Sequence, residues 1–237
     1  FYSAAPNLVA GDTNGVADVF VRDRQSGVTS RVSVNSTGGQ GNAYSTEPTI
    51  SPDGRFVVFA SLANTLVPGE ADWAEDIFIH DRTSGITSKV SVPLIGGIGN
   101  GGSSLPCLSA DGRYVAFFGW ASNLVAEDTN EAWDVFVHDR QDGLTSRVSV
   151  DSGGAQGNAD SGGGSLSSDG RFLAFSSWAL NLVSGDTNAT TDVFVRDLVA
   201  TGFTSSCDPG VAGVIACPCS NPPNGTGRGC DNSSATG

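Results

Sequence analysis

Four loops in this sequence repeat one pattern of oxygen-bearing side chains. These side chains stand at the first, third and seventh positions of each loop, as Asp12, Asn14 and Asp18; Glu70, Asp72 and Asp76; Asp128, Asn130 and Asp134; and Asp186, Asn188 and Asp192. Calcium prefers several side-chain and main-chain oxygens gathered by one flexible loop. The spacing therefore predicts calcium as a cofactor of these loops.

The same spacing also suits a structural turn without any metal. Asp and Asn oxygens accept hydrogen bonds from nearby backbone amides, and the last Asp of each loop would then cap the entry into the next strand. The loop is two residues shorter than calcium loops of the Asp-x-Asn-x-Asp-Gly type and lacks a terminal Glu that could bind in bidentate fashion. Both interpretations stay open at this point. Glycosylation of Asn188 would compete with ligation there.

Four of the five cysteines lie near the C-terminus, at Cys207, Cys217, Cys219 and Cys230. Their spacing lacks the paired C-x-x-C knuckles and histidines of a zinc site, so we expect disulfides. Sequons begin at Asn35, Asn188, Asn224 and Asn232 and are candidate N-glycosylation sites. Together these features predict a secreted or cell-surface protein, with a periplasmic location as the alternative.

No constellation of residues indicates catalysis. His80 and His138 are the only histidines, and they occupy equivalent repeat positions at which two other units carry Arg22 and Arg196. A position shared by His and Arg predicts a surface residue of a strand rather than half of a catalytic pair. We therefore expect no enzyme activity.

Two tryptophans lie in loops beside the acidic motif. Trp73 and Trp133 are candidates for stacking on a sugar or a protein partner, and the alternative is that they pack beneath the loops. The net charge of −13, with 12 Lys and Arg against 25 Asp and Glu, excludes nucleic acid as a natural partner. No apolar stretch of about 18 residues is present, so no membrane span is expected.

The elements that must position these loops follow from an internal repeat. The triplet Asp-Val/Ile-Phe begins at residues 18, 76, 134 and 192, always 58 residues apart. Asp-Gly-Arg keeps the same spacing from Asp53, Asp111 and Asp169. We expect propeller repeats over residues 1–200, with units 1–58, 59–116, 117–174 and a partial unit 175–200, followed by a Cys-rich, disulfide-bonded tail over 201–237.

Each unit reads as four short antiparallel strands. In the second unit these are 47–50, a tight turn at Asp53-Gly54, then 55–61, 76–81 and 87–92, with Val90 and Val92 on one face and Ser91 opposed. Four antiparallel strands make one propeller blade. The predicted fold class is thus all-β, a β-propeller-type repeat of four-stranded blades, because the fixed period disfavours a sandwich.

The turn and the strands around it resemble a known repeat family. The segment Glu-Pro-Thr-Ile-Ser-Pro-Asp-Gly-Arg-Phe-Val-Val-Phe over 47–59 is similar to repeats of the PD40, TolB-like family of WD40-like propellers. The resemblance covers about residues 1–197, with departures at 105–108 and 165–167. It implies a propeller that serves as an interaction surface more often than as an enzyme.

The repeat and the chain ends are out of register. Phe1 is equivalent to Phe59, which ends a second strand, so we expect the first blade to hold only its third and fourth strands. Residues 201–206 predict at most a weak fourth strand in the last blade. We expect a non-catalytic scaffold for protein or glycan partners, copies of itself included, that assembles head-to-tail through strand exchange into oligomers or fibres. The alternatives are a TolB-like periplasmic envelope accessory protein and a propeller-type hydrolase or lyase domain.

Overall fold

The structure is a computed structural model that describes residues 1–71 and 73–198. Fourteen strands in these residues form four antiparallel sheets, and no membrane-spanning helix is found among them. The first sheet holds β1 (Tyr2–Ser3), β2 (Asp18–Arg22) and β3 (Thr29–Arg31). The second holds β4 (Ser45–Ile50), β5 (Phe56–Ser61), β6 (Asp76–Asp81) and β7 (Ile86–Lys89). The third holds β8 (Ser103–Leu108), β9 (Tyr114–Gly119), β10 (Asp134–Asp139) and β11 (Leu144–Arg147), and the fourth holds β12 (Ser161–Leu166), β13 (Phe172–Ser177) and β14 (Asp192–Asp197).

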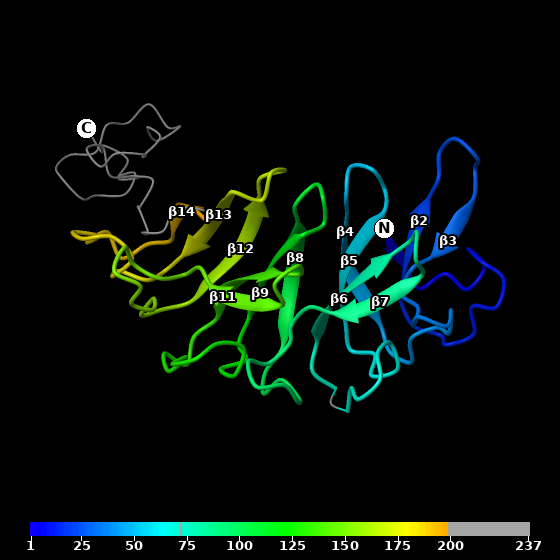
Figure 1. The fold of residues 1–237 in the computed structure, drawn as a ribbon, viewed down its shortest axis with the longest axis horizontal. Helices are drawn as coiled ribbons and strands as arrows, with labels where there is room; N and C mark the ends of the chain where they lie inside the picture. Colours follow the sequence, from blue (N-terminus) through cyan, green and yellow to red (C-terminus); the bar gives the residue numbers. More distant parts are fainter. Residues whose placement is uncertain (72, 199–237) are drawn as a thin grey trace.

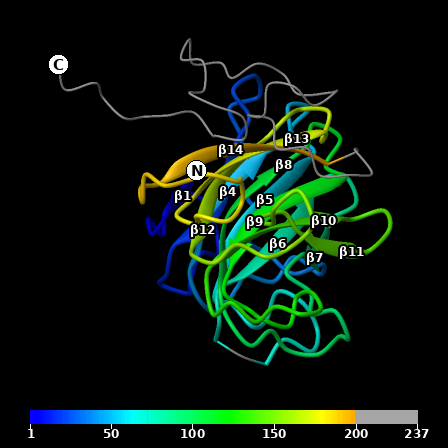
Figure 2. The same ribbon diagram turned by 90° about the vertical axis from the view of Figure 1, so that its left-hand side faces the viewer.

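The four sheets follow one another along an arc. The first sheet and the fourth sheet lie at opposite ends of the long axis of the described chain, as Figure 1 shows. The first strands β4, β8 and β12 face the neighbouring sheets, and the end-on view in Figure 2 shows the sheets stacked behind one another. The predicted all-β, propeller-type fold is confirmed.

The core lies between adjacent sheets and repeats with the sequence. A Phe of the second strand stacks on a Phe of the third strand in every sheet, at centroid distances of 5.7, 6.1, 5.7 and 5.6 Å. These pairs are Phe1–Phe20, Phe59–Phe78, Phe117–Phe136 and Phe175–Phe194. Both faces of β5 and β6 are buried, because each inner sheet packs against two neighbours.

The third strand was predicted best and the fourth least well. The expected strand 76–81 matches β6, whereas the strand expected at 87–92 is the shorter β7. Val90 and Ser91 are both buried, and Val92 is exposed, so the predicted alternation is wrong beyond Lys89. The reason is that Ser91 turns inward to donate a hydrogen bond to Asp76.

Every first strand contains a β-bulge at the same repeat position. The register shifts at Glu47 in β4, between Ser104 and Cys107 in β8, and at Gly163 in β12. Glu47 and Leu105 adopt φ values of 52° and 51°, which a side chain rarely tolerates, and the equivalent Gly163 has a φ of 55°. The bulge is therefore a regular feature of the repeat unit.

The first sheet corrects one expectation about the chain ends. Residues Tyr2 and Ser3 form β1 and pair with Val19 and Asp18, so the first sheet keeps the end of its second strand. Phe1 joins this pairing through two backbone hydrogen bonds with Phe20. The weak strand expected at 201–206 lies outside the described residues.

An Arg–carboxylate pair ties the second strand to the third in each of the last three sheets. The Arg113 guanidinium donates to Asp139 and holds the pKa of that carboxyl down to about 2. Since an unfolded Asp titrates near pH 4, the stabilisation is complete above about pH 4 and is lost as the pH falls towards 2.

We therefore expect Asp139→Asn to lower the melting temperature at pH 7. The difference in melting temperature between the two proteins should shrink as the pH falls from 4 to 2. Melting curves followed by circular dichroism across this range measure the difference between the two proteins. Asp142→Asn is the control, because Asp142 is an exposed carboxylate 3.3 Å from the same guanidinium. If Asp139→Asn lowers the melting temperature by the same amount at every pH, the stabilisation does not come from the charge of Asp139 beside Arg113.

Candidate functional site at the open edge of the first sheet

The acidic loop before β10 is folded around a cation of the chain itself. Arg147 Nη1 lies 2.9 Å from Asp128 Oδ1 and 3.3 Å from Asp134 Oδ2. Asn130 donates to the same Asp134 oxygen at 3.0 Å, and Ser149 donates to the other oxygen. Every carboxylate oxygen of the fully buried Asp134 thus faces a donor of the protein.

The first two loops repeat this arrangement. Arg31 lies 3.3 Å from Asp12 and 3.1 Å from Asp18. Lys89 takes the place of the arginine in the second loop and lies 2.7 Å from both Glu70 and Asp76. The Asn14 side-chain oxygen accepts a hydrogen bond from the Val16 backbone amide, as an Asx turn requires. Asp72 lies outside the described residues.

This geometry supports the hydrogen-bonded turn over the calcium loop. A guanidinium or ammonium already neutralises the carboxylates that a metal would need, and no cluster of three or more His, Cys, Asp or Glu ligands occurs within residues 1–71 and 73–198. In the fourth loop Asn188 donates to Asp192 at 3.1 Å, and the residue equivalent to Arg147 is Ser205, outside the described residues. Calcium binding stays a prediction.

Burial sets the protonation behaviour of these loops. It raises the pKa of Asp76 to about 6 against the opposing charge of Lys89, and it also raises the pKa of Asp134. The carboxylates are held in place because their donors are built into the same sheet. The loops therefore connect the second and third strands through carboxylates that are bonded to the same sheet.

Within residues 1–71 and 73–198, the first sheet has no strand that pairs with the end of β2 on the side of β1. In the second sheet β5 pairs with the whole of β6, from Ser61 opposite Asp76 to Phe56 opposite Asp81. In the first sheet β1 pairs only with the start of β2. By the alternation of an antiparallel ladder, the N–H and C=O of Arg22 point to the open side of β2. This is the edge on which another strand could pair.

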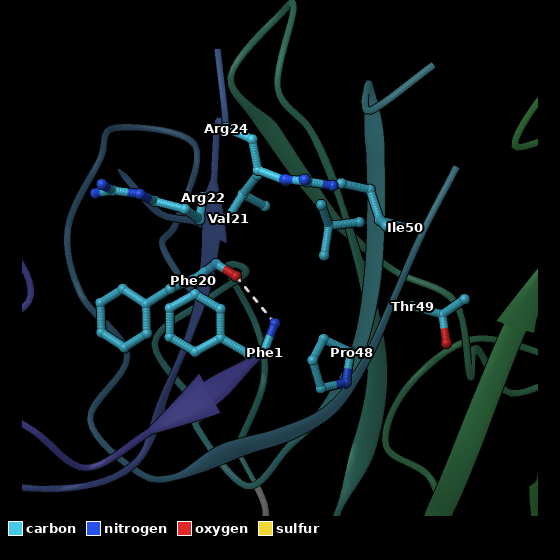
Figure 3. Close-up of a pocket in the computed structure, with 9 residues that line it drawn as sticks. Phe1, Phe20, Val21, Arg22, Arg24, Pro48, Thr49 and Ile50 are labelled. Atoms are coloured by element: carbon cyan, nitrogen blue, oxygen red, sulfur yellow. Dashed lines mark hydrogen bonds between the residues drawn. The ribbon is translucent and has the colours of Figure 1, made fainter. Parts of the chain in front are cut away.

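A groove of about 370 Å³ lies along this edge between the first and second sheets. Figure 3 shows residues of the first sheet facing residues of β4 across it. The groove is lined by Phe1, Phe20, Val21, Arg22, Arg24, Pro48, Thr49, Ile50 and Val57. Phe1 is 54% exposed here, whereas the equivalent Phe59 is completely buried, so the groove opens where other sheets are closed.

Solved structures with a similar fold are propeller-containing proteins. TolB from Acinetobacter baumannii is 18% identical with a TM-score of 0.45, over 80% of this chain and 37% of that one. A putative TolB from Agrobacterium tumefaciens is 16% identical with a TM-score of 0.49, over 81% of this chain and 56% of that one. The tricorn protease is 14% identical with a TM-score of 0.47, over 78% of this chain and 16% of that one.

The chain thus spans between about a sixth and just over half of these proteins. At such identities the likeness concerns the fold alone and says nothing about activity. No family model matches the chain, and no curated protein matches it either.

The histidines are buried rather than on the surface, which corrects the sequence-based expectation. His80 and His138 are 7% and 8% exposed, and each ring Nδ1 bonds to a Thr hydroxyl on the adjacent strand, Thr87 or Thr145. Burial lowers the pKa of both rings. Each ring lies beside the fourth strand of its own sheet, since His80 is opposite Thr87 in β7 and His138 is opposite Thr145 in β11.

The two candidate ligand-contact tryptophans are in different environments. Trp133 stacks on Phe118 at 4.5 Å and lies 6.0 Å from Trp120, so its ring packs beneath the loop. Trp73 is 62% exposed on the loop before β6. Trp73 is therefore the better placed of the two to contact a ligand, and ligand binding by either ring stays a prediction.

Only some of the remaining predicted sites lie within the described residues. Asn35 accepts three hydrogen bonds from its own turn and Asn188 is exposed, whereas Asn224 and Asn232 lie outside the described residues. The four tail cysteines, Cys207, Cys217, Cys219 and Cys230, also lie outside them. Cys107 is a free thiol in β8, and burial raises its pKa.

Sequence analysis missed the cations of the acidic loops and the polar end of the open edge. Arg31, Lys89 and Arg147 recur with the 58-residue period, each 13 residues after the last Asp of its loop. That recurrence could have predicted a cation in each of these loops. Asp23 and Arg24, which follow β2, recur with the same period as Asp81-Arg82 and Asp139-Arg140.

Proposed function

We propose that this protein is a non-catalytic, propeller-type scaffold, secreted or displayed at a cell surface, that binds other polypeptides, copies of itself included, by adding a strand to an open sheet edge. The observation that carries the proposal is the groove of about 370 Å³ between the first and second sheets, where no strand of the described residues pairs with Arg22 on the side of β1. Exposed edges pair readily with other strands, and proteins either cover them or use them for binding.

The surroundings of the groove support polypeptide binding. Its lining is largely apolar and includes Phe1, Phe20 and Ile50 beside Arg22 and Arg24. The apolar side chains offer surface to bury, while the backbone groups of Arg22 offer strand pairing. Both histidines of the chain are buried and bonded within their sheets, which agrees with a role in binding rather than in acid–base chemistry.

Light scattering over a concentration series tests the proposal with a matched pair of variants. We expect the intact chain to associate as its concentration rises, and Ile50→Lys to weaken this association at least tenfold by placing a charge in the groove. Ile86→Lys is the control, because Ile86 is similarly exposed on β7, outside the groove. The proposal would be contradicted if the chain stays monomeric at all concentrations and captures no polypeptide through this edge.

A further inference from the structure

Three of the four tryptophans of the chain lie where the third sheet meets the fourth. The ring of Trp120 is 6.0 Å from the ring of Trp133, whose backbone amide donates to Asp160 Oδ1 at 2.9 Å. The carbonyl of Asp160 in turn accepts a hydrogen bond from the Trp178 amide at 2.9 Å. We call this group, Trp120, Trp133, Asp160 and Trp178, the tryptophan platform.

The two outer tryptophans of the platform occupy the same place in neighbouring sheets. Trp120 directly follows β9 and Trp178 directly follows β13, 58 residues later. Each amide donates to the carbonyl just before the first strand of its own sheet, that of Gly102 at 3.0 Å or that of Asp160. Both side chains are more than half exposed, at 56% and 57%. Adjacent sheets therefore present an indole in the same way.

A second layer of rings supports Trp120 from beneath. The Trp133 ring stacks on Phe118 at 4.5 Å, and a Cβ placed on Gly162 of the fourth sheet would lie 2.8 Å from the Phe118 ring. The repeat itself does not require these rings. The equivalent residues of the second sheet are Ala60 and Glu75. Rings packed in this way hold Trp120 in place before a ligand arrives, which lowers the entropic cost of binding.

Polar groups surround the exposed rings. Asp160 is exposed, and within residues 1–71 and 73–198 only one of its carboxylate oxygens, Oδ1, accepts a hydrogen bond. Asn158 and Asn181, on the same two loops of the fourth sheet, are exposed as well. A protein partner favours a contiguous apolar patch with a central anchor. Separate aromatic rings with polar groups beside them suit a sugar chain better, because each sugar ring has an apolar face of C–H groups and a rim of hydroxyls.

We propose that the tryptophan platform is a carbohydrate site that takes an extended chain of neutral sugars. One sugar ring stacks on Trp120 and another on Trp178, and a hydroxyl between them donates to Asp160. Sheets that pack face to face lie about 10 Å apart, close to the length of a β-1,4-linked disaccharide. The Asp160 carboxylate disfavours acidic sugars, because like charges repel. The site is separate from the groove between the first and second sheets.

Titration calorimetry of the full chain tests the platform with three neutral hexasaccharides: cellohexaose, mannohexaose and chitohexaose. We expect saturable one-to-one binding of at least one of them. The corresponding monosaccharide should bind at least about tenfold more weakly, because it reaches only one of the two indoles. Hexagalacturonate, which carries a carboxylate on every ring, should also bind more weakly than the neutral chain.

Matched variants identify the rings that carry the binding. Trp120→Ala and Trp178→Ala should each weaken binding at least about tenfold. Within the described residues no aromatic ring packs on Trp178, so its loss should leave the melting temperature nearly unchanged even if Trp120→Ala lowers it. Trp73→Ala is the control, because Trp73 is 62% exposed in the second unit, outside the platform, and its loss should leave the affinity unchanged.

Three results would overturn the carbohydrate site: no binding of any of the three hexasaccharides, equal affinity for a hexasaccharide and its monosaccharide, or binding that survives loss of both Trp120 and Trp178. Capture of a polypeptide through these two rings, without sugar binding, would likewise show that the platform recognises protein. Ile50→Lys, which tests the groove, should leave sugar binding unchanged. The carbohydrate site and the proposed function can therefore fail separately.

Discussion

Replacement of Arg147 by Met should destabilise the protein by about 3–5 kcal/mol, because it leaves buried carboxylates without their counter-charge. Arg147 is the only cation within 4 Å of Asp128 and Asp134 in the described residues, and the side chains of all three are less than a tenth exposed. Thermal and urea unfolding measure the loss, which corresponds to a melting temperature lower by roughly 10 °C.

Arg113→Met is the matched control for Arg147→Met. Arg113 also pairs with a carboxylate, Asp139, but its side chain is 32% exposed, so its loss should destabilise the protein much less than the loss of Arg147. Equal losses for the two variants would contradict the buried-cation interpretation. A fall in the melting temperature of the unmodified protein on chelation of calcium would also contradict it, and would favour metal in the loops.

Replacement of Gly112 by Ala should cost about 2–5 kcal/mol, from two separate causes. Gly112 has a φ of 68°, a conformation that costs an L-residue about 1–2 kcal/mol. The added Cβ would also lie 2.3 Å from the Phe56 ring, and forcing a ring aside in a packed core costs about 1–3 kcal/mol more. Urea unfolding of the variant gives the total.

Gly54→Ala separates the two causes. Gly54 has a similar φ of 73°, but no ring lies beside it, so only the backbone cost of about 1–2 kcal/mol is expected. Phe56→Ala combined with Gly112→Ala should cost less than the sum of the single changes, because the clash disappears with the ring. Equal losses of unfolding free energy for Gly112→Ala and Gly54→Ala would show that the Phe56 ring moves aside without measurable cost.

The repeat made most of the fold predictable from sequence. The limits of β6 followed from the repeated Asp-Val/Ile-Phe triplet and from the Ser-Gly turn after it, and the turn at Gly54 followed from the Asp-Gly pair before β5. The bulge at Glu47 could not be predicted, since a positive φ at a Glu depends on contacts with the neighbouring sheet: Glu47 accepts the Leu105 amide at 2.6 Å.

The candidate sites were predicted less well, for a physical reason. Spacing along the chain brought Asp12, Asn14 and Asp18 together correctly, but it could not show that Arg31, from a different strand, lies among them. The incomplete first sheet was expected from the equivalence of Phe1 and Phe59, but the residues of β4 that line the groove beside it were not predicted. Sequence identifies groups within one loop more readily than partners that the sheet supplies.

The stacking of sheets through equivalent contacts has a consequence for how the molecule loses its structure. Each inner sheet is held by two neighbours, whereas the first sheet is held by one, through Ser45 and the Val19–Leu66 core. In such a one-dimensional array the free energy of unfolding is a sum over sheets and junctions, so opening one junction costs least at an end. Within the described residues, opening a junction at either end of the array should therefore cost less free energy than separating two inner sheets.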